Sequence, residues 1–161
     1  MASACASAED ALVFYTFGPD ETKRLGARLG RCLSPDAVVA LSGDLGTGKT
    51  CFARGVALGL GLPSSLHITS PSFSLVNEYE GGRIRLYHMD AYRLESLEAF
   101  FDAGLEEYFY EGGVAVLEWS DRWPQVLPAG SVRVLLVIEG LSEGGHRLRV
   151  EISNPPEGFT I

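Results

Sequence analysis

The residues best suited to chemistry form one glycine-rich stretch, which runs Gly43, Asp44, Leu45, Gly46, Thr47, Gly48, Lys49, Thr50. It fits the pattern G-x-x-x-x-G-K-[ST] of a phosphate-binding loop. Glycines let the backbone curl so that consecutive N–H groups point at phosphate oxygens. In such a loop the lysine reaches the β- and γ-phosphates and the final hydroxyl binds Mg²⁺. The stretch therefore predicts a site for a nucleoside triphosphate with Mg²⁺.

The flanking residues support this interpretation over a chance match in a glycine-rich chain. Residues 37–41 are a continuous apolar run, which is typical of a strand buried on both faces. From Lys49 onward, Phe52, Val56 and Leu60 recur at every fourth position, as in a helix with one apolar face. The chain therefore shows the order that the phosphate site requires, in which a strand is followed by the loop and then by a helix.

Two carboxylates are candidates for holding Mg²⁺ and its water. Glu118 ends the apolar run 114–117, where a core strand would deliver it beside the loop. The alternative is a strand-terminal acid that faces solvent. Asp90 follows a strand expected to end at Met89, and we expect it to hold a metal-bound water or position an attacking one. For Asp90, the alternative of a turn-capping acid stays open.

Other polar residues carry weaker signals. Residues 69–72, Thr-Ser-Pro-Ser, resemble a loop whose hydroxyl touches the γ-phosphate in P-loop hydrolases, but also any ordinary loop. Trp119 is a candidate for lining the nucleotide site or for the core. His67 and His88 are expected to pack or hydrogen-bond locally, and Cys51 to be a small buried helix residue. No N-K-x-D motif for guanine follows, which favours adenine.

Length and charge limit the class of protein. A chain of 161 residues suits one domain, and a net charge of -8 argues against a protein whose main task is to hold a nucleic-acid backbone or a membrane surface. No apolar run approaches membrane-spanning length. The three cysteines form no C-x-x-C pair, so free thiols in a reducing cytosol are expected.

The remaining pattern alternates strands with helices. Strands are expected at 13–17, 37–41, 73–79, 83–89, 114–117, 132–138 and 148–152, and helices at 20–33, 49–58, 96–101 and 105–110. This order predicts an α/β domain with a mainly parallel central sheet and antiparallel strand additions. We expect a loose N-terminal tail (1–11), a single domain (12–155) and a C-terminal tail (156–161).

An ordered set of motifs resembles the TsaE (YjeE) family of ATPases, which act in making the threonylcarbamoyl modification of adenosine in tRNA. The matching segments are 41–50, Thr-Ser-Pro-Ser-Phe-Ser-Leu-Val at 69–76, Tyr-His-Met-Asp-Ala-Tyr-Arg-Leu at 87–94, and Leu-Glu-Trp at 117–119. The resemblance covers about Phe14 to Val150. Ser72 stands where the family usually has Thr, so the loop loses a χ1-restricting methyl group. Ala91 stands where a larger apolar residue is usual.

The resemblance implies a three-layer P-loop NTPase domain that binds ATP and Mg²⁺ and hydrolyses ATP slowly by itself. By position, Lys49 would hold phosphates, Thr50 and Glu118 would serve Mg²⁺, and Asp90 would serve the metal and hydrolysis. It further implies that Ser72 sits in a switch loop, that Trp119 lies near the nucleotide, that Thr22 rims the adenine, and that Arg147 reaches the phosphates.

The implied partners are the TsaD and TsaB proteins in the cytoplasm, with tRNA contacted only indirectly or weakly. Two other functions remain open from the residues. One is a small-molecule kinase, although the arginines are scattered and no lid-like segment is evident. The other is a nucleotide-gated binding module that does not turn over.

Overall fold

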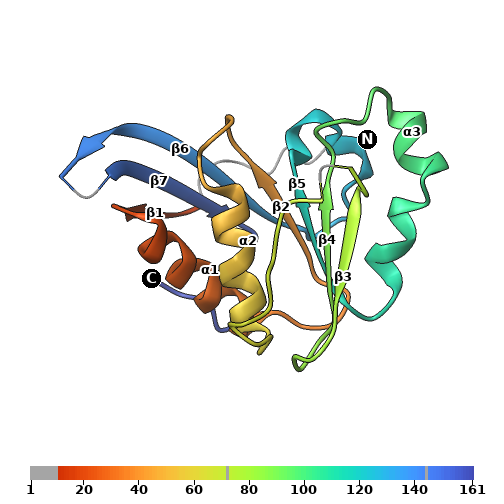
Figure 1. Ribbon diagram of the computed structural model, residues 1–161, viewed down its shortest axis with the longest axis horizontal. Helices are drawn as coiled ribbons and strands as arrows, with labels where there is room; N and C mark the ends of the chain where they lie inside the picture. Colours follow the sequence, from red (N-terminus) through yellow and green to blue (C-terminus); the bar gives the residue numbers. More distant parts are fainter. Residues whose placement is uncertain (1–10, 72, 144) are drawn as a thin grey trace, which may run out of the picture.

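The computed structural model describes residues 11–71, 73–143 and 145–161 (Figure 1). Its described residues form one seven-stranded sheet in the order β1-β7-β6-β2-β5-β4-β3. The strands are β1 (Leu12–Thr16), β2 (Val38–Ser42), β3 (Val76–Tyr79), β4 (Leu86–Asp90), β5 (Val114–Glu118), β6 (Val132–Ser142) and β7 (Gly145–Ser153). The helical segments are α1 (Pro19–Cys32), α2 (Lys49–Gly59), α3 (Leu97–Asp102) and the 3₁₀ segments η2 (Leu105–Tyr110), η3 (Ser120–Arg122) and η4 (Pro124–Val126).

The centre of the sheet is parallel and its margins are antiparallel. β2 pairs in parallel with β5 and β6, and β5 with β4. β7 returns antiparallel along β6, β1 adds to β7, and β3 adds to β4. All residues of β4 and β5 are buried. β5 is a continuous apolar run up to Glu118, as expected of a strand covered on both faces, whereas β4 also carries the buried polar residues His88 and Asp90. The expected α/β class and mixed sheet are confirmed.

Helical segments cover both faces of the sheet, giving three layers. One apolar cluster joins α1 and α2 to Val39, Leu41 and Val116 of the sheet. A second joins α3 and η2 to the opposite face through Ala115 and Leu117. Figure 1 shows α1 and α2 side by side, with α3 on the far side of β4.

Glycines let α1 and α2 pack closely. Gly26 and Gly30 of α1 face Gly55 and Gly59 of α2, and a Cβ on any of the four would collide with backbone atoms of the other helix. Both pairs are spaced four residues apart, so each places its glycines on one side of its helix. This fixes α2, and with it the loop that precedes α2, against the domain.

Some boundaries differ from the sequence-based expectation. β3 begins at Val76 rather than residue 73, because the backbone turns through 73–75, with Leu75 at a φ of 68°. The β6–β7 hairpin is longer than expected at its tip. Asp90 is the last residue of β4 rather than the residue after it.

The segment 156–161, expected as a tail, instead packs against the domain. The ring of Phe159 is buried against Phe14, with the ring centroids 5.7 Å apart. Arg28 of α1 donates from Nη2 to the Thr160 carbonyl oxygen at 2.7 Å. The expected tail 1–11 lies almost wholly outside the described residues. Within the described ranges, no helix is long and apolar enough to cross a membrane.

Candidate functional site

The phosphate-binding loop connects the end of β2 to the start of α2. Gly43, Gly46 and Gly48 have φ values of 145°, 80° and 97°, a region that disfavours side chains with a Cβ. At Gly43 an added Cβ would also lie 2.5 Å from the Leu136 carbonyl oxygen of β6. The Thr47 hydroxyl donates to the Asp44 carbonyl oxygen at 2.9 Å and ties the curl together. The loop thus has the curled backbone expected of a phosphate cradle.

Lys49 lies inside this curl with its side chain 5% exposed. Its Nζ donates to the carbonyl oxygens of Gly43 and Asp44 at 2.7 and 2.8 Å. The same ammonium lies 3.9 Å from the centroid of the Trp119 ring, a cation–π contact. Burial lowers the Lys49 pKa, while nearby carboxylates, Glu118 foremost, oppose that shift. The loop therefore holds a desolvated cation suited to an anionic ligand.

The two candidate carboxylates meet at the ends of adjacent parallel strands. Asp90 of β4 is paired in register with Glu118 of β5, and both side chains are buried. The Thr50 hydroxyl, in the first turn of α2, donates to Glu118 Oε1 at 2.9 Å. Since the carboxyl ends of parallel strands share one edge of the sheet, the fold delivers both acids to the mouth of the loop.

Each carboxylate has further partners. Glu118 Oε1 lies 2.8 Å from His88 Nε2 in β4. Asp90 accepts the Ser70 hydroxyl at 2.5 Å and the Tyr92 backbone N–H at 2.8 Å. Ser70 belongs to the 69–72 loop that the sequence singled out. The expected Ser72 lies outside the described residues.

A cavity of about 460 Å³ opens between the loop and the two strand ends. It is lined by Leu45, Gly46, Gly48, Lys49, Thr50, Ser70, Asp90, Tyr92, Arg93, Glu118 and Trp119. The structure thus brings together five side chains expected from the sequence: Lys49, Thr50, Asp90, Glu118 and Trp119. Trp119 adopts the left-handed φ of 61°, and its ring centroid lies 4.9 Å from that of Tyr92.

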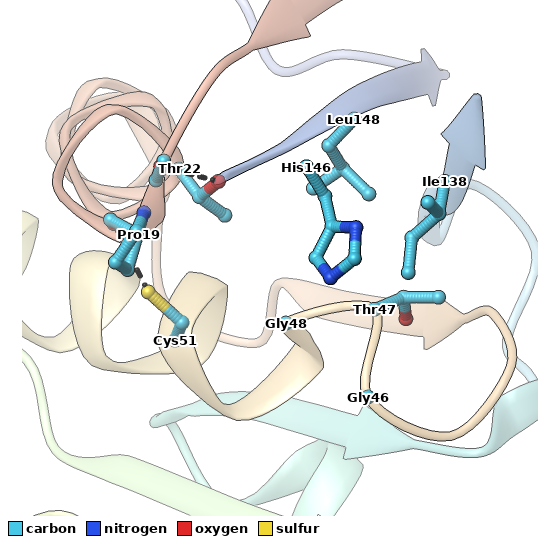
Figure 2. A pocket seen from close by; sticks show the side chains of 10 residues that line it. Pro19, Thr22, Gly46, Thr47, Gly48, Cys51, Ile138, His146 and Leu148 are labelled. Atoms are coloured by element: carbon cyan, nitrogen blue, oxygen red, sulfur yellow. Dashed lines mark hydrogen bonds between the residues drawn. The ribbon is translucent and has the colours of Figure 1, made fainter. Parts of the chain in front are cut away.

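A second cavity, of about 140 Å³, lies on the other side of the loop. Figure 2 shows His146 of β7 pointing toward the loop backbone, with Thr22 and Cys51 on the facing helices. Its lining is largely apolar and includes Ile138 and Leu148 of the hairpin. Thr22 lines this cavity, and its expected role of rimming a base stays a prediction. His146, Ile138 and Leu148 carry no sequence signal, because only the folded hairpin brings them to the loop.

Arg147 lines neither cavity. Its guanidinium lies over the Tyr15 ring at 4.5 Å and 4.0 Å from a carboxylate oxygen of Glu139. Because side chains alternate along a strand, the neighbour His146 points toward the loop while Arg147 points away from it. The hairpin therefore presents His146, rather than Arg147, to the loop.

The donor set fits Mg²⁺ bound together with phosphates. Mg²⁺ prefers oxygen ligands and in nucleotide sites takes one or two from the protein, with the rest from phosphates and water. Thr50 supplies a hydroxyl, and Glu118 and Asp90 supply carboxylates, all lining one cavity. The described residues contain no cluster of three or more acidic, histidine or cysteine side chains that would hold a metal alone.

The chain is similar to known proteins over most of its length. The family model described as "Threonylcarbamoyl adenosine biosynthesis protein TsaE" matches residues 17–147. The tRNA threonylcarbamoyladenosine biosynthesis protein TsaE of Treponema pallidum is 47% identical over 81% of this chain and 93% of its own length. The protein of that name from Bacillus subtilis is 38% identical over 82% and 81% of the two chains.

A solved structure is also similar. The crystal structure of Bacillus subtilis YdiB superposes with a TM-score of 0.68 at 33% identity, covering 88% of this chain and 85% of the other. The family match includes the loop and the two strand ends, and the structural match covers most of the chain. The chain belongs to the TsaE family.

Proposed function

We propose that this protein is an ATP-hydrolysing subunit of the machinery that forms threonylcarbamoyladenosine in tRNA. The observation that carries the proposal is the contact of Thr50 with Glu118 at 2.9 Å, directly beside the curled loop and Asp90. Curated relatives at 38–47% identity bear the name of that biosynthetic pathway.

The chain's own groups divide the work at the phosphates. The N–H groups at the start of α2 and the Lys49 ammonium bind phosphate oxygens. Because the Thr50 hydroxyl directs its hydrogen to Glu118, its lone pairs remain for Mg²⁺. Bound Mg²⁺ would supply charge neutralisation on the phosphates. Asp90, held by Ser70 and the Tyr92 N–H, orients the attacking water.

The second cavity is the proposed site of the adenine base. It adjoins the loop at Gly46, Thr47 and Gly48, so a nucleotide could run from one cavity to the other along the loop. Its apolar walls suit a flat base. Trp119, over Lys49, closes the phosphate side.

The partners we propose are TsaB and TsaD in the cytoplasm, with ATP hydrolysis resetting that transferase complex between turnovers. The net charge of -8 fits a subunit that leaves most tRNA contacts to its partners. Hydrolysis by the isolated chain is then expected to be slow.

The test is Mg²⁺-dependent phosphate release by this chain alone and with purified TsaB–TsaD. We expect a slow rate that rises with the partners and falls roughly a hundredfold or more in Lys49→Ala, because a phosphate-binding charge is lost. Lys23→Ala is the matched control, since Lys23 is the other lysine of the chain and lines neither cavity. No stimulation of the folded chain by the partners would remove them from the proposal.

Two carboxylate variants separate an ATPase from a binding module without turnover. Glu118→Gln and Asp90→Asn should each slow phosphate release by about a hundredfold or more while nucleotide still binds. Unchanged release in both, with partner binding that still follows ATP, would favour the module. Transfer of the γ-phosphate to a metabolite in place of release as free phosphate would favour a kinase.

A further inference from the structure

His88, near the end of β4, is a buried polar side chain that the proposed mechanism leaves without a role. It is 0% exposed and lies in register with Val116 of β5. Because side chains alternate along a strand, His88 and Asp90 project from one face of β4, and Glu118 projects from the same face of the sheet. The imidazole therefore lies directly behind the carboxylates of the site.

The contact between His88 and Glu118 is specific. His88 Nε2 lies 2.8 Å from Glu118 Oε1, and the Thr50 hydroxyl donates to that same oxygen at 2.9 Å. The Thr50 hydroxyl is also 3.3 Å from Oε2. One oxygen of the carboxylate is thus held from two sides, by a core strand and by the first turn of α2.

The two ring nitrogens identify the tautomer. A Glu118 carboxylate is an acceptor, so Nε2 carries the hydrogen. Nδ1 is buried and has no hydrogen-bond partner among the described residues. A proton on Nδ1 would leave a buried donor unpaired, which is rarer in proteins than an unpaired acceptor. The geometry places the ring hydrogen that faces Glu118 on Nε2.

We propose that His88 is a positioning residue that fixes the carboxylate of Glu118 toward Thr50 and the Mg²⁺ site. This rests on the proposed function, because it assigns Glu118 to the metal and its water. A glutamate side chain has three rotatable bonds, and a rigid donor in the core strand removes much of that freedom. Donors to carboxylates around a metal commonly orient them and are costly to remove.

The competing explanation is that His88 only fills space in the core. Two variants separate the explanations. His88→Leu keeps a similar volume and removes the hydrogen-bond donor. His88→Gln retains a side-chain amide N–H at about the position of the imidazole Nε2, where it can still donate to Glu118. His67→Leu makes the same change at an exposed position outside both cavities and serves as the matched control.

The first measurement is the Mg²⁺ concentration that gives half-maximal ATP hydrolysis, with the partners present. His88→Leu should raise that concentration, or lower the maximal rate, by roughly tenfold or more. His88→Gln and His67→Leu should stay close to the unaltered chain, and Mg²⁺-free binding of a fluorescent nucleotide should change in none of them. If His88→Leu folds and keeps the Mg²⁺ dependence of the unaltered chain, His88 does not position Glu118.

The second measurement needs neither nucleotide nor Mg²⁺. Nitrogen-15 NMR of the imidazole in the full chain, assigned by the resonances lost in His88→Gln, should show a hydrogen on Nε2, the nitrogen that faces Glu118. The opposite tautomer would overturn the proposal even if His88→Leu fails to fold. If the unaltered chain does not hydrolyse ATP, that result counts against the proposed function. The NMR result would then be the remaining test of the contact between His88 and Glu118.

Discussion

At the scale of single residues, the two carboxylates of the site differ in what holds them. Glu118 is held by His88 and Thr50, which belong to a core strand and to α2. Asp90 is held by the hydroxyl of Ser70, in the loop before β3, and by the Tyr92 backbone. A shift of that loop would therefore act on Asp90 first and leave Glu118 in place.

Sequence reasoning singled out the two acids and Thr50, but it did not identify Ser70 and His88 as partners of the acids. Glu118 ends β5, which pairs with β2, and Asp90 ends β4, which pairs with β5. Both acids are recognisable in the sequence because each stands at the carboxyl end of an expected strand, where ligands of parallel sheets bind. The contact of His88 with Glu118 depends on the register of β4 against β5, which no local pattern of the chain specifies. The roles of these side chains toward nucleotide and metal remain predictions.

Cys51 offers a residue-scale test of the second cavity. Burial raises the pKa of its thiol, which donates to the Pro19 carbonyl oxygen at 3.1 Å. Less thiolate is then present at neutral pH than in an exposed cysteine, so iodoacetamide should label Cys51 more slowly than glutathione, and faster as the pH rises. Because Cys51 lines the proposed base cavity, ADP with Mg²⁺ should slow the labelling further.

The labelling of each cysteine can be followed by mass spectrometry of its peptide. Cys32 is the internal control, because it is the last residue of α1 and lines neither of the two cavities beside the loop. Its labelling should be the same with and without ADP. Equal protection of both cysteines would indicate a general stiffening of the chain, and no protection of Cys51 would place the base elsewhere.

At the scale of elements, local pattern predicted the buried strands well and misplaced the start of β3. β2 and β5 are continuous apolar runs with both faces covered. Residues 73–75 alternate like a strand, yet they form a turn in which Leu75 has a φ of 68° and Phe73 is 84% exposed. Alternation of apolar and polar residues is a weak signal of a strand at the edge of a sheet, where the segment has only one neighbouring strand and only one of its faces can be buried.

The position of the loop depends most directly on the packing of α1 against α2. Alanine favours a helix interior over glycine by about 1 kcal/mol, so propensity alone would make Gly55→Ala stabilising. A methyl group at Gly55 would collide with the Lys23 carbonyl oxygen of α1. We expect the collision to prevail and Gly55→Ala to lower the free energy of unfolding by about 1–3 kcal/mol, measured by urea denaturation.

Gly140→Ala is the matched control for that substitution. Gly140 lies in β6 and has no neighbouring atom within 4 Å of an added Cβ, so its variant should unfold close to the midpoint of the unaltered chain. A Gly55→Ala protein as stable as the unaltered chain would mean that the two helices separate easily. The glycines would then not fix the loop.

At the scale of the whole molecule, the family and the three-layer fold were predictable and the second cavity was not. The family follows from motifs that are contiguous in sequence, and the match to residues 17–147 confirms it. The second cavity joins Thr22, Gly48 and His146 from α1, the loop and the far hairpin. Segments so distant meet only through the sheet order that carries β7 and β1 beside β6.

Nucleotide binding should stabilise the entire domain, because the proposed ligand site joins the loop, residues of α1 and α2, and the strand ends. A ligand at about one hundred times its Kd adds about 2.7 kcal/mol to the folded state. For a chain of this size that corresponds to a rise in Tm of roughly 5–10 °C. Differential scanning fluorimetry with a non-hydrolysable ATP analogue and Mg²⁺ measures it. Lys49→Ala should abolish most of the rise, and Lys23→Ala should retain it.

EDTA should reduce the rise without removing it, since Lys49 and the loop N–H groups still bind phosphate when Thr50 and Glu118 have no metal to hold. A rise that is identical with and without Mg²⁺ would instead show that these two residues contribute nothing to ligand binding in the isolated chain.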